Sequence, residues 1–272
     1  RGFNGQTLHP NILSKHLLGE FYDDLAEGGL HGRPRSLATR RKIVEVVQLF
    51  WAWAYDDEDY GEYVPRPRRL RMRRQDGAPT VAPTWAEMDA CIREASGWHR
   101  QLATLLRFTG LRVQQAMQLT WEDLDLEKAT LCVRGELGKS RQERRGRIIP
   151  VSRYLVEELE GWGPREGWII ESGRFRDGPR AREARSRDMA RAWTRAGVRP
   201  EAWGQPHHSF RKGFVSELKR SRADSDAVEF LVGHSLGLRG VYTDPSALPL
   251  QEAVGLVPRL GIARPVIELV GK

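Results

Sequence analysis

The chain has 272 residues, and its 44 Lys and Arg against 36 Asp and Glu give a formal net charge of +8. A basic surplus of this size favours a polyanionic partner, nucleic acid first, although a charged surface can also serve solubility alone. Two cysteines exclude a disulfide framework, and no apolar run approaches the ~18 residues of a membrane span. We expect Cys91 and Cys132 to be small buried apolar residues of a reduced protein.

The first sixty residues have the pattern of amphipathic helices. Apolar residues spaced four apart begin a helix at Asn11, and Gly28 and Gly29 end it. Ser36 is the expected N-cap of a second helix that continues to about Tyr55. The apolar side of this second helix is expected to contain Ile43, Val47, Phe50, Trp51 and Ala54.

A segment rich in proline and arginine, residues 61–83, follows without apolar periodicity. We interpret it as an interdomain linker between a helical domain of residues 1–60 and a second domain of residues 84–272. Its charge suits contact with a DNA backbone, although a flexible tether or a solvated basic face are alternatives. The candidates for phosphate contacts in this half of the chain are Arg40, Arg41, Lys42, Arg68 and Arg69.

Residues 84–272 combine several helices with one small sheet. Thr84 and Glu87 predict a capping box for a helix that ends near Glu94. Two short segments, 130–134 and 147–151, predict a β-hairpin. The fold class is therefore mainly α with a small antiparallel β-sheet (α+β). Further helices are expected at 98–108, 113–119, 152–162, 182–196, 209–222, 225–232 and from 250 onward.

Two arginines stand in distinctive local contexts. Arg112 follows the turn Thr109-Gly110-Leu111, and Arg211 ends the unit His208-Ser209-Phe210-Arg211. A phosphodiester under attack gains negative charge on its non-bridging oxygens, and fixed guanidinium donors stabilise that charge. In a chain with so many arginines, only these local contexts distinguish the two.

Four further residues could complete a phosphoryl-transfer site. Tyr242 lies among small and polar residues rather than in an amphipathic helix, so it is the candidate nucleophile. His208 is a candidate base for its phenol, and His234 a donor to the phosphate. Lys139, the lysine of the hairpin loop, could protonate the leaving oxygen. The same loop supplies three candidates for DNA contacts: Arg141, Arg144 and Arg145.

In this order, Thr109–Arg112, Lys139, His208–Arg211, Gly233-His234 and Tyr242 resemble the active-site motifs of the tyrosine recombinases of the phage integrase family. The resemblance covers about residues 84–258, and residues 11–60 resemble the later helices of the family's small core-binding domain. The hairpin loop is slightly longer than the common form, and the His234-to-Tyr242 spacing is slightly shorter. Lys212 stands where histidine is common.

The resemblance implies a two-domain DNA clamp, a helical core-binding domain plus a tyrosine-recombinase catalytic domain. It implies a catalytic set of Arg112, Lys139, His208, Arg211, His234 and Tyr242, and a 3′-phosphotyrosyl intermediate without metal, nucleotide or other cofactor. The family acts on double-stranded DNA sites as a homo-tetramer, in the cytoplasm or nucleoid of a prokaryotic or viral host and away from membranes.

The resemblance also bears on the two ends of the chain. The first helix of the core-binding domain is not found, so we expect further residues before residue 1. The C-terminal helix and tail, about 249–272, are expected to dock on a neighbouring subunit. Removing these residues should then impair tetramer assembly and spare DNA binding.

Two other classes of protein remain open at this point. A type IB topoisomerase shares the chemistry but relaxes supercoils without joining two sites. A non-catalytic accessory DNA-binding protein would have lost a catalytic residue, and all six are present here.

Overall fold

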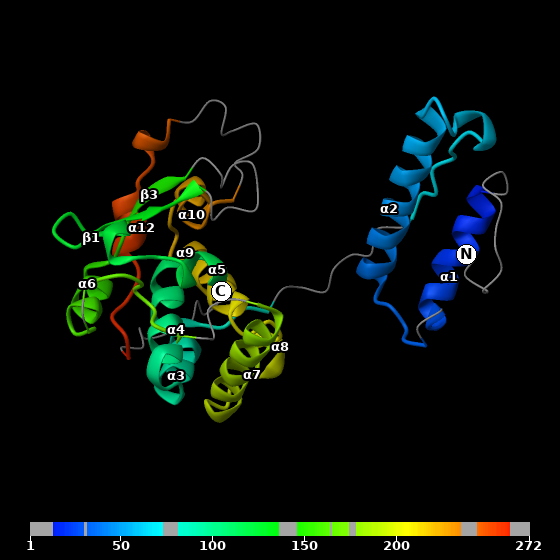
Figure 1. The fold of residues 1–272 in the computed structure, drawn as a ribbon. Coiled ribbons are helices and arrows are strands. Elements are labelled where there is room, and N and C mark those ends of the chain that lie inside the picture. The colour runs from blue at the N-terminus through cyan, green and yellow to red at the C-terminus, as the bar shows by residue number, and fades with distance from the viewer. Residues whose placement is uncertain are drawn as a thin grey trace, which may run out of the picture. The chain divides into compact units, whose positions relative to one another are not determined.

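The computed structural model describes residues 13–29, 32–72, 81–135, 146–163, 165–173, 178–234 and 244–261. The chain divides into two compact units, residues 1–79 and residues 80–272. Figure 1 shows both as ribbons, with the first unit in blue and cyan.

Unit 1 contains the two helices that the sequence predicts, α1 (Lys15–Glu27) and α2 (Leu37–Asp56). The Ser14 and Ser36 side chains cap them by accepting hydrogen bonds from backbone N–H groups three residues ahead. Gly28 ends α1, as expected. The small core of the unit consists of Leu18, Trp51, Ala54 and Val64.

Part of the segment that we interpret as a linker packs on α2. The Trp51 indole N–H donates to the Pro65 carbonyl at 2.7 Å, and the Leu70 N–H donates to the Gln48 side-chain oxygen at 2.8 Å. Val64 is buried in the core of unit 1. The first residues of the range 61–83 therefore belong to unit 1 rather than to a free connection.

The predicted apolar side of α2 is only partly correct. Trp51 and Ala54 are buried and Ile43 and Val47 are half-buried, but Phe50 is 62% exposed, and the buried Val44 was not predicted. Apolar residues occur on both sides of this helix, and among the described residues the stripe toward α1 and the 64–70 segment is the covered one. Periodicity alone does not show which stripe has a neighbour. Other exposed apolar side chains of α2 are Val46, Leu49 and Trp53.

Unit 2 contains the predicted mixture of helices and one small sheet. The Thr84–Glu87 capping box is present at the start of the first helix. The short helix α8 and strand β1 are additions to the prediction. The elements are α3 (Trp85–Glu94), α4 (Gly97–Thr109), α5 (Val113–Met117), β1 (Leu124–Asp125), β2 (Thr130–Val133), β3 (Arg147–Pro150), α6 (Arg153–Glu160), α7 (Pro179–Arg195), α8 (Pro200–Trp203), α9 (His208–Arg220), α10 (Ser225–Val232) and α12 (Leu250–Gly255).

The three strands form an antiparallel sheet in the order β1-β2-β3. Leu131 pairs with Ile149 on the buried face, and Cys132 pairs with Ile148 on the exposed face. The expectation that both cysteines are buried is therefore wrong for Cys132, because successive residues of a strand face opposite sides of the sheet. Cys91 is fully buried, as expected.

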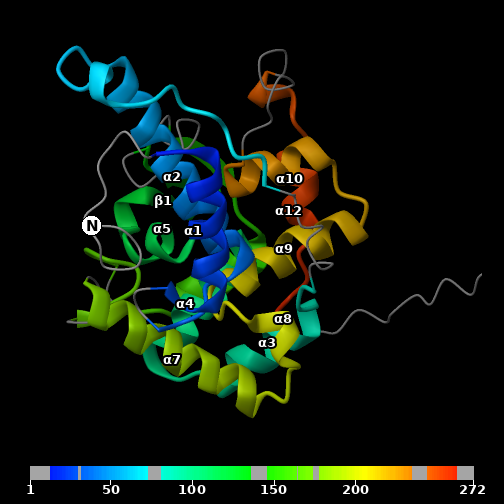
Figure 2. The ribbon, with the colours of Figure 1, turned by 90° about the vertical axis from the view of Figure 1, so that its right-hand side faces the viewer.

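Helix α9 lies between α4 and α10, as Figures 1 and 2 both show. Its apolar residues fill the core, where Phe210 packs on Trp193 and Phe214 meets the edge of Trp85. A Cβ on Gly213 would lie 2.7 Å from the Met88 sulfur and from the Pro83 carbonyl. This close approach fixes the position of α9 along α3. It therefore also fixes the position of the residues at the start of α9.

Helix α12 belongs to the core of its own unit. Ala253, Val254 and Val257 are buried in the same cluster as α9 and α10. The Pro258 carbonyl accepts a 2.6 Å hydrogen bond from Arg107 of α4. Removing all of 249–272 would therefore strip core residues from unit 2, so that deletion cannot test assembly alone.

Candidate active site

Arg112 is placed by a glycine turn between two helices. Gly110 ends α4 in the left-handed conformation, with φ of 61°, and its N–H donates to the Leu106 carbonyl at 2.9 Å. The chain then turns, and Arg112 precedes the first residue of α5. The Arg112 backbone N–H donates to the Gln115 side-chain oxygen at 3.2 Å. Gln115 thereby fixes the backbone from which the Arg112 guanidinium extends.

Arg211 reaches the same turn from α9. Its side chain is 2% exposed, and its Nη1 donates to the Gly110 carbonyl at 3.0 Å. Nε and Nη2 are buried and have no hydrogen-bond partner within the described parts of the chain. Burial, followed by the positive charges of Arg112 and Arg147, lowers the pKa of Arg211 to about 9. A buried cation with donors to spare favours an anionic ligand.

His208 is the first residue of α9, one helical turn before Arg211. Partial desolvation lowers the pKa of His208, and the charges of Arg211, Lys212 and Arg112 lower it further. The imidazole is therefore mainly neutral at pH 7 and can accept a proton. His234 also contributes to this lowering of the His208 pKa, so the two histidines and the two arginines influence one another electrostatically.

His234 follows a second glycine turn, at the end of α10. Gly233 is left-handed with φ of 73°, and the His234 N–H donates to the Glu229 carbonyl at 2.8 Å. The His234 Nδ1 lies 2.5 Å from Oε2 of Glu229, so Nε2 is the ring nitrogen left for another ligand. Burial and the charge of Arg211 lower the pKa of His234, against the opposing effect of Glu229.

Glu229 is the carboxylate that supports His234. Its second oxygen accepts a 2.7 Å bond from Lys219. Burial raises the pKa of Glu229, but the hydrogen bonds from Lys219 and His234 outweigh that effect and hold the pKa below its usual range. Glu229 therefore stays charged and orients the imidazole.

Four of the six predicted catalytic residues thus lie together: Arg112, His208, Arg211 and His234. Lys139 and Tyr242 lie outside the described residues, as do Arg141, Arg144 and Arg145. Sequence reasoning missed Gln115, Arg147 and Glu229. Gln115 and Glu229 lie only three and five residues from Arg112 and His234, so a Gln at the third helical position and a nearby carboxylate were usable local signals, whereas Arg147 acts through a contact with Leu231, 84 residues away.

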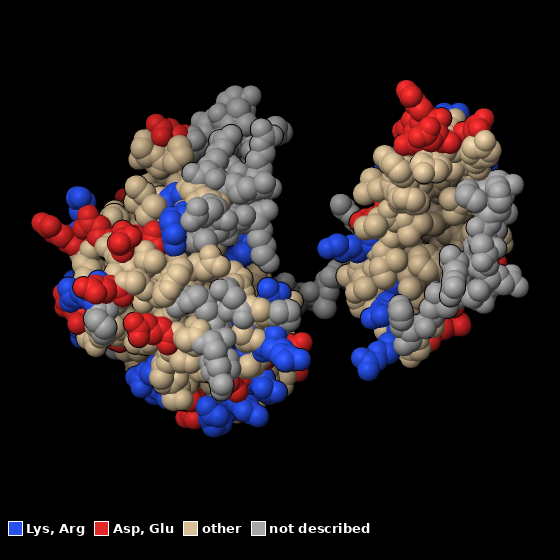
Figure 3. Space-filling view, in the orientation of Figure 1, with Lys and Arg blue, Asp and Glu red and all other residues tan. Residues whose placement is uncertain are grey.

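The basic candidates of unit 1 differ in their surroundings. Arg40 packs over the Tyr22 ring, at 4.6 Å from its centroid, and Arg41 lies 3.9 Å from Glu45. Figure 3 shows basic residues toward the end of unit 1 where α2 begins, and acidic residues where it ends. The remaining three candidates are exposed: Lys42, Arg68 and Arg69.

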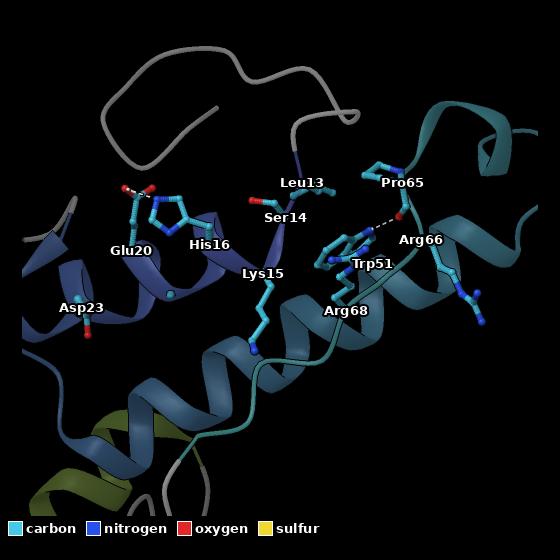
Figure 4. A pocket seen from close by; sticks show the side chains of 11 residues that line it. Leu13, Ser14, Lys15, His16, Glu20, Asp23, Trp51, Pro65, Arg66 and Arg68 are labelled. Atoms are coloured by element: carbon cyan, nitrogen blue, oxygen red, sulfur yellow. Dashed lines mark hydrogen bonds and ion pairs between the residues drawn. The ribbon is translucent and has the colours of Figure 1, made fainter.

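A pocket of about 850 Å³ in unit 1 contains none of the predicted catalytic residues. Figure 4 shows that Lys15 and Trp51 line it together with the segment around Pro65. Glu20 and Asp23 lie on the same wall as His16. The lining combines the cations Lys15, Arg66 and Arg68 with these two carboxylates, whereas the predicted catalytic residues that the structure describes all lie in unit 2.

The described residues lack both a membrane-spanning helix and a metal-binding cluster. Within those ranges, no helix is long and apolar enough to cross a membrane. The same residues contain no group of three or more His, Cys, Asp or Glu side chains arranged to hold a metal ion.

The fold of this chain is that of tyrosine-recombinase catalytic domains. The structure of the XerH site-specific recombinase bound to palindromic difH substrate superposes with a TM-score of 0.62 at 21% sequence identity. That match covers 85% of this chain and 69% of XerH. The mainly helical fold class with a small antiparallel sheet is thereby confirmed.

Sequence comparison gives the family. The phage integrase family profile matches residues 86–244, more than half of the chain, and the chain belongs to this family of tyrosine recombinases. Prophage integrase IntZ of Escherichia coli K12 is 32% identical over 154 residues, which cover 55% of this chain and 36% of IntZ. Tyrosine recombinase XerC of Xanthomonas campestris pv. campestris strain B100 is 30% identical over 229 residues, covering 78% of this chain and 66% of XerC.

Proposed function

We propose that this protein is a site-specific DNA recombinase that cuts and rejoins strands through a 3′-phosphotyrosyl intermediate. The observation that carries the proposal is the convergence of Arg112, His208, Arg211 and His234 at the ends of three helices. Family membership supports the same reading. The chain spans about a third of IntZ and two thirds of XerC, so the activity of the whole protein is inferred here from the site itself.

The chemistry follows from the charges and donors of the site. The Tyr242 oxygen attacks phosphorus and forms a new O–P bond, while the bond to the 5′-oxygen breaks. His208, neutral at pH 7, accepts the phenolic proton, and Lys139 gives a proton to the leaving 5′-oxygen. Arg112 and Arg211 bind the non-bridging oxygens with His234.

The phosphotyrosyl bond conserves the energy of the broken phosphodiester. A 5′-hydroxyl from a partner duplex can therefore attack it and restore the DNA backbone without a nucleotide or metal cofactor. We infer that four copies act on two double-stranded DNA sites, in the cytoplasm of a prokaryotic or viral host. In this proposal residues 1–60, together with the following residues to about 70 that pack on α2, form the core-binding domain, and residues 84–272 form the catalytic domain.

The phosphotyrosine is tested with nicked duplexes that tile the DNA flanking the gene. The nick lets the 5′-hydroxyl fragment diffuse away and traps the adduct. In EDTA and without ATP, we expect an SDS-resistant protein–DNA band that maps to Tyr242. Tyr242→Phe should abolish the band and leave duplex binding within about twofold, because only one hydroxyl is lost. Tyr154→Phe, in α6 of the same unit, is the matched control and should retain the band.

The outcomes separate the competing functions. A persistent band in Tyr242→Phe would identify another nucleophile. Binding without any band would favour an accessory DNA-binding protein. If the band forms, a two-site strand-exchange assay distinguishes a recombinase from a type IB topoisomerase, which would relax a supercoiled plasmid without joining the sites.

A further inference from the structure

Arg147, the first residue of β3, bonds to the end of a helix that is distant in the sequence. Its Nε and Nη2 both donate to the Leu231 carbonyl, at 3.3 and 3.1 Å. Leu231 lies in the last turn of α10, where carbonyl groups lack partners within the helix. A guanidinium at this position satisfies such a carbonyl and complements the negative end of the helix dipole.

The same guanidinium lies against the Gly233 turn. A Cβ on Gly233 would be 2.7 Å from Nη1 of Arg147 and 2.8 Å from its Cζ. Gly233 also has φ of 73°. A glycine is therefore required at position 233 for two reasons: the positive φ of the backbone, and the Arg147 side chain that packs against it. His234 is the next residue.

Packing alone does not account for an arginine here. Burial and the charge of Arg112 lower the pKa of Arg147 to about 10, and Arg147 in turn lowers the pKa of Arg211. The residue is therefore a third cation held close to two others at pH 7. An apolar side chain could fill the space without that repulsion, but it could not hold the Leu231 carbonyl.

We propose that Arg147 is a positioning residue that fixes the His234 turn relative to strand β3. Its hydrogen bonds hold the end of α10, and its plane supports Gly233, so that the His234 ring meets Glu229 at the observed 2.5 Å. The importance of this positioning for catalysis rests on the function proposed above.

The positioning itself can be tested on the full chain without DNA. In NMR spectra of the protein with ¹⁵N-labelled histidine, the His234 Nδ1 proton that is bonded to Glu229 should give a resonance in the wild type. This proton should be protected from exchange with solvent. In Arg147→Met we expect this resonance to broaden or disappear, and in Arg147→Lys to be partly restored. Arg153→Met removes the same charge from an exposed site and serves as the control. An unchanged His234 resonance in Arg147→Met would overturn the proposal, whatever the protein does to DNA.

Adduct formation on the nicked duplex tests the catalytic consequence. Arg147→Met should slow it by about 10–100-fold, as expected when a supporting residue of a site is lost. In a His234→Ala background the same change should cost less than about threefold, since the residue that it positions is already gone. An equal decrease in the rate of adduct formation in both backgrounds would mean general structural damage and would refute the proposal. A wild type that forms no adduct would refute the proposed function, and the resonance experiment would still decide the role of Arg147.

Discussion

Arg211 combines two properties that oppose each other. Its guanidinium is almost fully buried, and it lies within electrostatic reach of both Arg112 and Arg147. Each of these conditions destabilises the folded state, because a buried charge without a full set of partners loses more hydration than it regains. A site built to hold an anion carries this destabilisation until the anion binds.

Replacing Arg211 by methionine should therefore separate stability from activity. Below pH 9 the arginine is protonated in both the folded and unfolded states, so its burial is unfavourable throughout that range. We expect Arg211→Met to raise the free energy of unfolding at pH 7 by about 1–3 kcal/mol. Adduct formation should fall by at least about 10²-fold. Urea unfolding and the nicked-duplex assay measure the two effects, and a loss of stability would contradict this account.

His207 predicts a specific pH dependence of stability. It is 8% exposed, and burial, followed by the charges of Arg185 and His99, lowers its pKa to about 4. Between pH 6.5 and 4 the unfolded chain therefore takes up a proton that the folded chain does not, and the folded state loses about 3 kcal/mol as the pH falls. Urea unfolding between pH 7 and pH 4 should show a smaller decrease in the free energy of unfolding for His207→Leu than for the wild type. Parallel curves for the two proteins would exclude this role.

At the scale of elements, the site depends on how closely α4, α9 and α10 approach one another at Gly110. A Cβ at this position would lie 2.6 Å from the Phe214 ring and 2.9 Å from Cγ1 of Val232. Phe214 belongs to α9 and Val232 to α10. The same glycine supplies the carbonyl that receives Arg211. One backbone position thus sets the separation of the helices that carry the arginines and histidines.

Gly110→Ala should be more damaging than a glycine replacement elsewhere in α4. Both Gly110 and Gly97 have positive φ, but nothing lies within 4 Å of a Cβ on Gly97. Gly97→Ala should lower the free energy of unfolding by about 1–2 kcal/mol, because of backbone strain alone. Gly110→Ala should cost about 1–3 kcal/mol more because of the overpacking. Thermal and urea unfolding compare the two variants, and equal losses would show that the helices relax around the added methyl group.

The same elements show which features a sequence can reveal. The caps at Ser36 and Thr84 and the glycine end of α4 were predictable, because each depends on residues only a few positions apart. The order of the arginine and histidine motifs also predicted a common site. The bond from Arg147 to Leu231 joins residues 84 positions apart, and no periodicity encodes it. The exposed side of α2 escaped prediction for the same reason, since burial depends on which neighbour covers a helix.

At the scale of the molecule, the C-terminal region is tied to the rest of its unit as far as the structure describes it, to residue 261. Up to that point it is anchored in unit 2: the Gly261 N–H donates to Oδ2 of Asp89 at 2.9 Å, and Asp89 pairs with the buried Arg107 at 2.9 Å. Arg107 in turn holds the Pro258 carbonyl. A test of assembly must leave this network intact, which restricts the deletion to residues 262–272.

Deleting residues 262–272 should weaken tetramer assembly and spare the fold. This segment includes the mainly apolar stretch Val266 to Val270, interrupted by Glu268, and we expect it to add to a neighbouring copy as a strand. We expect an unchanged melting temperature and unchanged binding to a single site, but at least ~10-fold less tetramer on DNA with paired sites. Mass photometry of the DNA complexes measures this. Deletion of 249–272 is the control, and it should lower the melting temperature because it removes Ala253, Val254 and Val257 from the core. If the shorter deletion assembles as well as the full chain, the subunits associate through another surface.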